Sequence, residues 1–590
     1  MSELGALPSP EWGSDAIAAF LRETGVEYIA LNPGASYRGL HDSLVNYLGD
    51  SGPTMLMTLH EEHAVAIAHG YAKLSGRPLA VALHSNVGLM HAAMAIYNAY
   101  ADRVPMLILG AAGPADADRR RPWIDWLHTT ADQPAIVRNY VKWDDSPLSV
   151  AATLSSLSRA WELTSAPPQA PTYVVLDVSV QEERITEQPK QPRVFERAGW
   201  ARPVAAQDAV KEALGLLRGA QRPVILSGRS GAGAQEYADR VQLAEMLGAR
   251  VVTDLKANSS FPTRHPLHVN GAGFFLSPEA IEALGEADVV VALDWIDLAG
   301  ALRQAPARAA RAVVAVTLDP YLHNGWSKDH GDWPVVDVWL PAVAEDGVRQ
   351  LIEAAEDDPV SSGAVISPRL PQETSGGAES RPLHDPIPLA ELADALRSTV
   401  AADEVVLARL PLGWDSAWWD FSSPTDYLGY DGGGGIGSGP GMAVGAALAA
   451  RDDERMVVAV LGDGDFLMGA TAVWTGVKYG AAALVVVANN RSYFNDEVHQ
   501  EKVAHHRDRD PSRKWVGQRI DDPAPDIAMI ARAQGAIGLG PVIDPAQLRP
   551  VLEEAAALVR NGAFVVVDVR VGAGYSELMA GGLVREVTPG

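Results

Sequence analysis

Short valine-rich hydrophobic runs alternate with helical patterns along almost the whole chain. The runs are apolar at successive positions, which is typical of strands that are covered on both faces. They comprise residues 78–85, 104–111, 172–178, 222–228, 249–255, 288–295, 455–463, 482–490 and 563–571. Segments between runs, such as 60–76 and 439–452, have the length and composition of crossover helices. The pattern predicts an α/β protein built on parallel sheets.

Two stretches interrupt this alternation and are predicted to be linkers, because they are rich in proline and in charged or small polar residues. They are residues 182–204 and 355–388. We therefore expect three α/β domains near 1–184, 200–354 and 385–590, of which the outer two could share a fold. The glycine-rich residues after 571 are expected to form a frayed end or a flap.

Composition and charge narrow the range of functions. Aspartate and glutamate outnumber lysine and arginine by 74 to 48, and the net charge of −26 argues against a nucleic-acid partner, which would be repelled. The chain has no cysteine, so disulfides and thiol chemistry are excluded. We expect no secretory signal and no membrane span, because no apolar run reaches about 18 residues. A cytoplasmic enzyme, or an enzyme-like scaffold, is the expectation.

The clearest chemical signal lies where two successive runs end. Gly-Asp-Gly-Asp at 462–465 ends one run, and Asn490 follows the next, 27 residues after Asp463. Ligands of open α/β sheets bind at the carboxyl ends of strands. An aspartate carboxylate, an asparagine amide and a backbone carbonyl are hard oxygen ligands suited to Mg²⁺, and the glycines allow phosphates to approach. The alternatives are two ordinary turns, or a calcium loop, which Met468 and Trp474 do not fit.

This spacing resembles the signature of thiamine diphosphate enzymes. The resemblance spans nearly the whole chain and is to the decarboxylase/acetolactate synthase family, whose pyrimidine-binding, central and diphosphate-binding domains follow in that order. It implies that Asp463 and Asn490 bind Mg²⁺ and that Ser492 adds its backbone carbonyl. It also implies that the cofactor's diphosphate lies against Gly462, Gly464 and Asp465.

A second motif agrees with the first. The family has a glutamate nine residues before the glycine of a GYA motif, and Glu61 stands nine residues before Gly70. A carboxyl group there activates the cofactor by sharing a proton with the pyrimidine N1′. The alternative is a polar residue at a helix start. Residues 434–441 are similar to the segment that supports the bent cofactor, with Ile436 beneath the bend and Gly435 beside it.

The residues that face the substrate are predicted from weaker likenesses. His84, in Leu-His-Ser, resembles the histidine loop of benzoylformate decarboxylases and has a pKa suited to proton transfer. Residues 32–36 resemble the NPGS loop of those enzymes, which places Gly34 at the cofactor, although alanine stands where they have the substrate-binding serine. His128 lies near a Phe-Gln pair of acetolactate synthases, and His499 replaces their specificity tryptophan. Each histidine could instead be structural.

The resemblance implies decarboxylation of a 2-oxo acid, with transfer of the acyl group to an aldehyde as a further step. A 2-hydroxyacyl-CoA lyase or acyloin lyase is the alternative within the same chemistry. A non-catalytic scaffold and a nucleotide-dependent oxidoreductase are alternatives of other classes. The central glycine turn at 228–233 could hold FAD or ADP, but we favour an empty central domain. The family further implies a homodimer, and commonly a tetramer, with Glu61 and Asp463 acting across a subunit interface.

Overall fold

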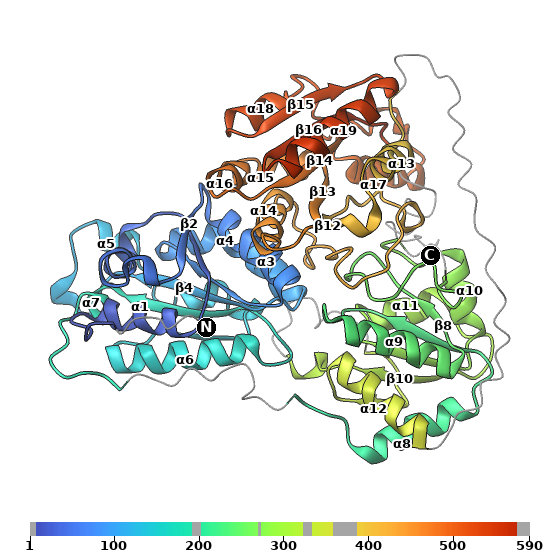
Figure 1. Ribbon diagram of the computed structural model, residues 1–590, viewed down its shortest axis with the longest axis horizontal. Coiled ribbons are helices and arrows are strands. Elements are labelled where there is room, and N and C mark those ends of the chain that lie inside the picture. Colours follow the sequence, from blue (N-terminus) through green and yellow to red (C-terminus); the bar gives the residue numbers. More distant parts are fainter. Residues whose placement is uncertain (1–6, 191–201, 270–272, 323–332, 358–385, 575–590) are drawn as a thin grey trace.

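The computed structural model describes residues 7–190, 202–269, 273–322, 333–357 and 386–574. Three lobes follow one another along the chain, coloured blue to cyan, green to yellow, and orange to red (Figure 1). All ladders between the named strands are parallel. The predicted class of three parallel-sheet α/β domains is thereby confirmed.

The N-terminal domain has a six-stranded sheet of order β2-β1-β3-β4-β6-β5. Its strands are β1 (Tyr28–Leu31), β2 (Thr54–Met57), β3 (Leu79–Ala82), β4 (Met106–Ala112), β5 (Trp143–Asp145) and β6 (Thr172–Asp177). Its helices are α1 (Gly13–Glu23), α2 (Arg38–Asp42), α3 (Glu61–Ser75), α4 (Ser85–Ala101), α5 (Ile124–Leu127), α6 (Val150–Ser165) and α7 (Val178–Gln181). Helices α1 and α6 lie on one side of the sheet, and α3 and α4 on the other (Figure 1).

The central domain has a five-stranded sheet of order β11-β10-β9-β7-β8. Its strands are β7 (Pro223–Ser227), β8 (Arg250–Val252), β9 (Val289–Leu293), β10 (Ala312–Val316) and β11 (Val338–Leu340). Its helices are α8 (Gln207–Arg218), α9 (Ala234–Leu247), α10 (Pro278–Glu286), α11 (Leu298–Gln304) and α12 (Ala344–Asp357).

The C-terminal domain has a five-stranded sheet of order β12-β13-β14-β16-β15. Its strands are β12 (Val405–Arg409), β13 (Met456–Gly462), β14 (Ala483–Asn489), β15 (Ile537–Val542) and β16 (Phe564–Arg570). Its helices are α13 (Leu389–Thr399), α14 (Gly439–Ala449), α15 (Asp463–Gly469), α16 (Ala472–Lys478), α17 (Phe494–His506), α18 (Ile527–Ala533) and α19 (Pro545–Arg560).

Each hydrophobic run singled out in the sequence overlaps a strand, and the two predicted crossover helices correspond to α3 and α14. Most strands that the pattern missed, including β2, β5 and β15, lie at sheet edges. Residues of these three strands are partly exposed, so their hydrophobic runs are less continuous. Much of the two predicted linkers, and the tail from 575, lie outside the described residues, so the domain boundaries stay predictions.

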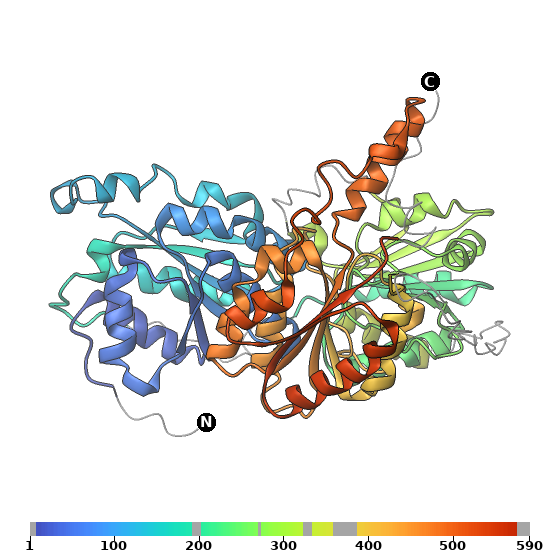
Figure 2. The ribbon, with the colours of Figure 1, turned by 90° about the horizontal axis from the view of Figure 1, so that it is seen from above.

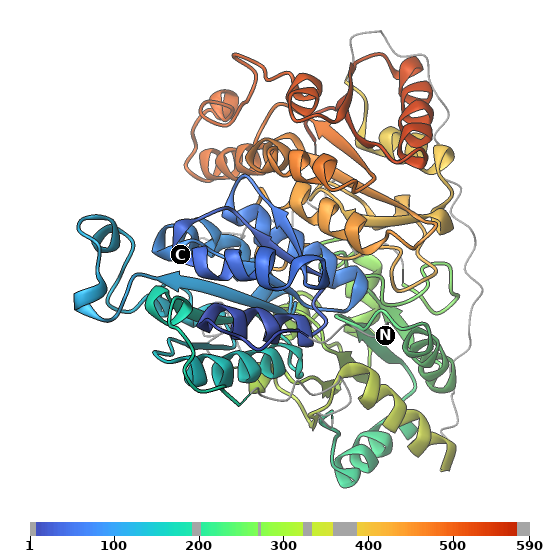
Figure 3. The same ribbon diagram turned by 60° about the vertical axis from the view of Figure 1, so that its left-hand side comes forward.

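The N- and C-terminal domains share one hydrophobic core, which includes residues of α3 and α14. The two domains lie side by side in Figures 1 and 3. Glycines allow the close approach of these helices, because a Cβ at Gly70 would lie 2.1 Å from the Met442 carbonyl oxygen and one at Gly445 only 2.0 Å from that of Ile67. In the part of the chain that the structure describes, no helix is long and apolar enough to cross a bilayer.

Candidate active site

Parallel pairing brings the predicted metal ligands to one edge of the C-terminal sheet. Strand β13 pairs with β14, with Gly462 opposite Ala488, so Asp463 and Asn490 follow neighbouring strand ends. Gly462 is the extended N-cap residue of α15, and Asp463 is the first residue of that helix. Asp463 is therefore fixed by the strand-to-helix turn, and it is only 3% exposed.

Burial leaves the Asp463 carboxylate in an electrostatically unfavourable state. Its Oδ2 is buried and has no hydrogen-bond partner among the residues that the structure describes. Burial raises the pKa of Asp463 to about 6, although nearby backbone N–H groups act to lower it. An unpaired oxygen of this kind is costly unless a ligand satisfies it. The Asn490 amide oxygen accepts the Ser492 N–H at 2.9 Å, which brings the Ser492 backbone close. These oxygen donors fit Mg²⁺.

The glycine loop at 434–441, just before α14, is held by Asp465. One oxygen of Asp465 accepts the N–H groups of Gly437 at 2.7 Å and Gly439 at 3.2 Å, and the other lies 3.7 Å from Arg409 Nε. Gly437 has a φ of +107°, which favours glycine. Asp465 thus shapes the loop, and its contact with a diphosphate stays a prediction.

The glycine loop at 434–441 is also held by residues that the sequence motifs did not single out. The Asn98 side chain on α4 bonds both the N–H of Gly435, at 3.3 Å, and its carbonyl, at 3.0 Å. Buried Arg409 pairs with Asp431 at 2.7 Å and packs on the Tyr430 ring. No short motif marks these residues, because they come from distant parts of the chain. The half-buried Ile436 follows Gly435 in a loop that both domains hold.

Glu61 is the first residue of α3 and is 4% exposed. Its Oε2 lies 3.0 Å from Nδ1 of His91 on α4. Gly88 leaves room for it, because a Cβ at that position would lie 3.0 Å from Cγ and Oε1 of Glu61. Burial raises the pKa of Glu61, but hydrogen bonds from His91 and Asn32 outweigh it and hold the pKa below its usual range. The carboxylate is therefore ionised at neutral pH.

The surroundings of His84 come from the segments that follow two neighbouring strands. Since β1 pairs with β3, the loop at 32–36 meets His84, which is the N-cap residue of α4. Ser36 Oγ lies 2.8 Å from His84 Nδ1, and a Cβ at Gly34 would lie 2.4 Å from His84 Cγ. In this structure Gly34 makes room for His84, and its contact with a cofactor stays a prediction.

A second histidine accompanies the first. The ring of His128, at the end of α5, meets the His84 ring edge-on, with centroids 4.6 Å apart. Burial lowers the pKa of His84, and His128 lowers it further against the opposing effect of Glu61. His84 is therefore neutral near pH 7 and can both accept and donate a proton. Two of the three predicted catalytic histidines are in this way brought together.

His499 stands apart from this pair. It lies half-buried on α17, and among the described residues its side chain takes part in no hydrogen bond, ion pair or ring contact. The dark-orange helical segment that contains α17 extends away from the rest of the C-terminal domain (Figure 2). A catalytic role for His499 stays a prediction.

The central glycine turn is engaged by the protein itself. Arg229 pairs with Asp294 and Asp319 and donates to the Ala101 carbonyl, which ties the central domain to the N-terminal one. The Gly231 N–H donates to the Glu345 carboxylate. A carboxylate there would repel the phosphate of FAD or ADP.

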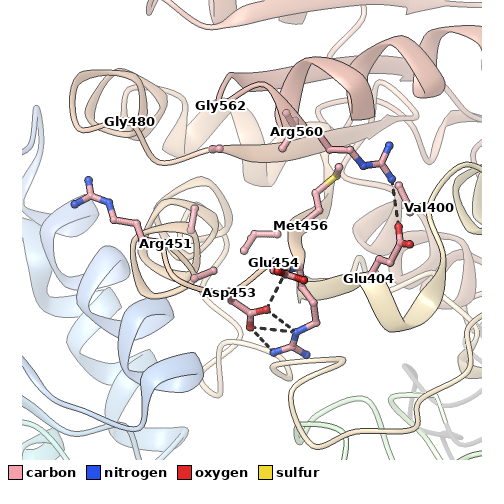
Figure 4. A pocket seen from close by; sticks show the side chains of 15 residues that line it. Val400, Glu404, Arg451, Asp453, Glu454, Met456, Gly480, Arg560 and Gly562 are labelled. Carbon is pink, nitrogen blue, oxygen red and sulfur yellow. Dashed lines mark hydrogen bonds and ion pairs between the residues drawn. The ribbon is translucent and has the colours of Figure 1, made fainter.

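A cavity of about 560 Å³ lies at the opposite edge of the C-terminal sheet, near the amino ends of its strands. Two ion pairs line it, Arg560 with Glu404 and Arg455 with Asp453 (Figure 4). It lies away from the strand ends that carry Asp463 and Asn490, so it is not the candidate site.

The fold and the strand-end residues define an α/β protein whose buried Asp463 and neighbouring Asn490 lie at the carboxyl ends of adjacent parallel strands. Family comparisons are more specific. Residues 11–136 match the N-terminal TPP binding domain of thiamine pyrophosphate enzymes, 210–324 their central domain and 412–569 their C-terminal TPP binding domain. The chain belongs to the family of thiamine diphosphate-dependent enzymes.

Several relatives are similar along most of their length. A probable 2-ketoarginine decarboxylase of Pseudomonas aeruginosa is 26% identical over 88% of this chain and 88% of its own. A benzoylformate decarboxylase of the same organism is 26% identical over 74% and 79%. The acetolactate synthase large subunit of Haemophilus influenzae is 22% identical over 94% of each chain.

Solved structures share the fold. A thiamine diphosphate-dependent 4-hydroxybenzoylformate decarboxylase of Rhodococcus jostii superposes with a TM-score of 0.76, at 20% identity, over 96% of this chain and 100% of its own. A benzoylformate decarboxylase of Polynucleobacter necessarius gives the same values. At this level of identity the likeness concerns the three-domain architecture.

Proposed function

We propose that the protein is a thiamine diphosphate- and Mg²⁺-dependent enzyme that decarboxylates a 2-oxo acid and can transfer the remaining acyl group to an aldehyde. The observation that carries this proposal is the buried Asp463 carboxylate, whose Oδ2 lacks a partner next to Asn490. Sequence similarity to decarboxylases of two different 2-oxo acids supports the reaction class without selecting a substrate.

The roles of the chain's own residues follow from their surroundings. Asp463, Asn490 and the Ser492 carbonyl would hold Mg²⁺, and the loop at 434–441 would receive the cofactor. When bound, thiamine diphosphate supplies an electron sink next to the substrate carbonyl. Glu61 would hold a proton at the pyrimidine nitrogen. His84, neutral and fixed by Ser36, is the group that would move protons to and from substrate carbon and oxygen atoms.

A second copy of the chain would complete the site. Apolar side chains near both halves of the site are exposed, among them Met90 and Met94 on α4 and Met468 on α15. Unpaired methionines on one face are typical of a surface that a partner covers. We therefore propose a homodimer, with a tetramer as the next assembly, which light scattering on the intact protein would test. The predicted cytoplasmic location would be tested by cell fractionation.

The first experiment is titration calorimetry of the metal-stripped protein with thiamine diphosphate, with and without Mg²⁺. We expect tight binding only with Mg²⁺, because the two phosphate groups and the Asp463 carboxylate would otherwise repel each other. Binding would justify a screen of 2-oxo acids for CO₂ release and aldehyde formation. Absence of binding under both conditions would overturn the proposal.

The lyase alternative would be tested with the same holoenzyme. A 2-hydroxyacyl-CoA ester or an acyloin would be cleaved to an aldehyde without CO₂ release. If such a substrate turned over while every 2-oxo acid failed, the assignment would move from decarboxylase to lyase.

A further inference from the structure

The activating glutamate shares its surroundings with a compact group of histidines from two helices. His60 is the N-cap residue of α3, and its Nδ1 accepts the Glu62 N–H at 3.2 Å. The His60 ring stacks on the His91 ring, with centroids 4.9 Å apart and planes inclined by 21°. His91 in turn contacts Glu61 Oε2 at 3.0 Å. The helix start at 60–62 and His91 therefore close a ring of contacts around the carboxylate.

His91 alone among these histidines reaches Glu61 with a hydrogen bond. Since Glu61 is ionised, Nδ1 of His91 is the donor. Burial lowers the pKa of His60, and proximity to His91 lowers it further. Burial lowers the pKa of His63 to about 4. His60 and His63 are therefore uncharged near neutral pH. Among these histidines, only His91 then stabilises the Glu61 carboxylate through a direct contact.

We propose that His91 is a positioning residue that keeps the Glu61 carboxylate ionised and oriented until the cofactor binds. The proposal rests on the function proposed above and names a residue that determines how the glutamate receives its proton. On cofactor binding, Glu61 would take up one proton from solvent and share it with the pyrimidine nitrogen. His91 would keep its Nδ1–H directed at Glu61 Oε2 throughout.

Several other groups face Glu61 and could change its protonation. Tyr37, from the segment after β1, is uncharged, because burial and Glu61 both raise its pKa. His84, at the start of α4, is neutral for the reasons given above. Asn32 donates a hydrogen bond without titrating. Glu62 instead faces Asp465, which raises its pKa in addition to the effect of burial. His91 is thus the neighbour whose removal should change the protonation of Glu61 most.

The test measures protons taken up on cofactor binding, by calorimetry in buffers of different ionisation enthalpy, with Mg²⁺ present and over a range of pH. The wild-type protein should take up about one proton more than Glu61→Gln at neutral pH, because the variant has no carboxylate to protonate. As the pH is lowered, the extra uptake disappears once the Glu61 carboxyl is already protonated in the cofactor-free protein. In His91→Leu this should happen at a pH about one unit higher than in the wild type, because the lost hydrogen bond raises the pKa of Glu61.

Three comparisons separate a positioning role from a merely structural one. His91→Gln keeps a neutral donor and should restore most of the wild-type profile. His91→Leu made in the Glu61→Gln background should leave proton uptake unchanged, because the effect runs through Glu61. His41→Leu removes an exposed histidine from α2 and should match the wild type.

The outcomes distinguish this inference from the function on which it rests. If the wild-type protein binds no cofactor, the proposed function fails first. If it binds, and His91→Leu has the same pH profile of proton uptake as the wild type, the role of His91 is disproved. An equal shift in the Glu61→Gln background would also disprove it, because His91 would then act on another group.

Discussion

The N-terminal and C-terminal domains have the same strand order once edge strand β2 is set aside. The order β1-β3-β4-β6-β5 corresponds position by position to β12-β13-β14-β16-β15. By this correspondence α3, which precedes β3, is the counterpart of α14, which precedes β13. No convincing sequence repeat relates the two domains, so the likeness lies in topology rather than in residues.

The corresponding strand ends carry different chemistry. His84 is the N-cap residue of α4, the helix after β3, and Asp463 is the first residue of α15, the helix after β13. A neutral imidazole suits proton transfer, whereas a buried carboxylate with an unpaired oxygen suits a cation. The same topology therefore provides a candidate site at the corresponding strand end of each domain, and the residue at that strand end decides which chemistry the site can support.

The largest effect is expected at the proposed metal site. Asp463→Asn removes the charged ligand while it keeps the shape of the side chain, so Mg²⁺-dependent cofactor binding should be lost in calorimetry, and turnover with it. Asp452→Asn changes an exposed aspartate before β13 and serves as the control. If Asp463→Asn bound cofactor like the wild type, the two strand ends would not differ as proposed.

Glu61→Gln should lower kcat by about 10²- to 10⁴-fold, the range of a lost acid–base group, while cofactor affinity changes little. Steady-state kinetics and calorimetry would measure the two quantities. Glu62→Gln alters the neighbouring residue, which faces Asp465 instead, and should keep most of the turnover. Wild-type turnover in Glu61→Gln would remove this residue from the mechanism.

The seam between the domains should be sensitive to acid through His63. This side chain is 3% exposed and lies 3.2 Å from Thr471 Oγ1 of the C-terminal domain. Burial lowers its pKa to about 4, so below about pH 6.5 the unfolded chain binds a proton that the folded chain does not. Up to about 3 kcal/mol of stability should be lost as pH falls from about 6.5 to 4.

His63→Gln should reduce this acid sensitivity. The difference between melting temperatures at pH 7.5 and pH 5 would be measured for the variant and for His41→Gln, which changes an exposed histidine. Equal acid sensitivity in all three proteins would show that His63 is not the responsible group.

The packing of α3 on α14 can be tested at one atom. Gly445→Ala places a Cβ 2.0 Å from the Ile67 carbonyl oxygen, so the helices must separate, at a cost of about 1–3 kcal/mol. Gly215→Ala, on α8, meets no atom within 4 Å and should stabilise by about 0.5–1 kcal/mol. Thermal unfolding would compare them. A stable Gly445→Ala protein would contradict the close seam.

The smallest effect is expected at His84, the proposed proton-transfer residue. Ser36→Ala removes the hydrogen bond at His84 Nδ1 and should lower kcat by about tenfold, the equivalent of about 1.4 kcal/mol. Cofactor affinity should not change. Ser36→Thr keeps the hydroxyl and is the matched variant, so equal kinetics in all three proteins would show that Ser36 does not position His84.

The hydrophobic pattern of the chain predicts the fold class, and short motifs predict the most diagnostic candidate residues. Buried parallel strands need continuous hydrophobic runs, and these can be read directly from the chain. The Gly-Asp-Gly turn, Asn490 and Glu61 could be recognised because each belongs to a local motif with fixed spacing. His84 and His128 were singled out separately, yet nothing in their spacing of 44 residues predicts that their rings meet.

The partners of these residues could not be predicted from the sequence, because they come from distant segments that meet in the folded chain. His91 contacts Glu61 from another helix, Ser36 reaches His84 because β1 pairs with β3, and Asn98 reaches Gly435 across more than 300 positions. Charge states followed from the same packing, because burial and neighbours set the pKa values of Asp463, Glu61 and His63. A local sequence pattern can identify a candidate functional residue. The environment of that residue depends on distant segments that the fold brings together.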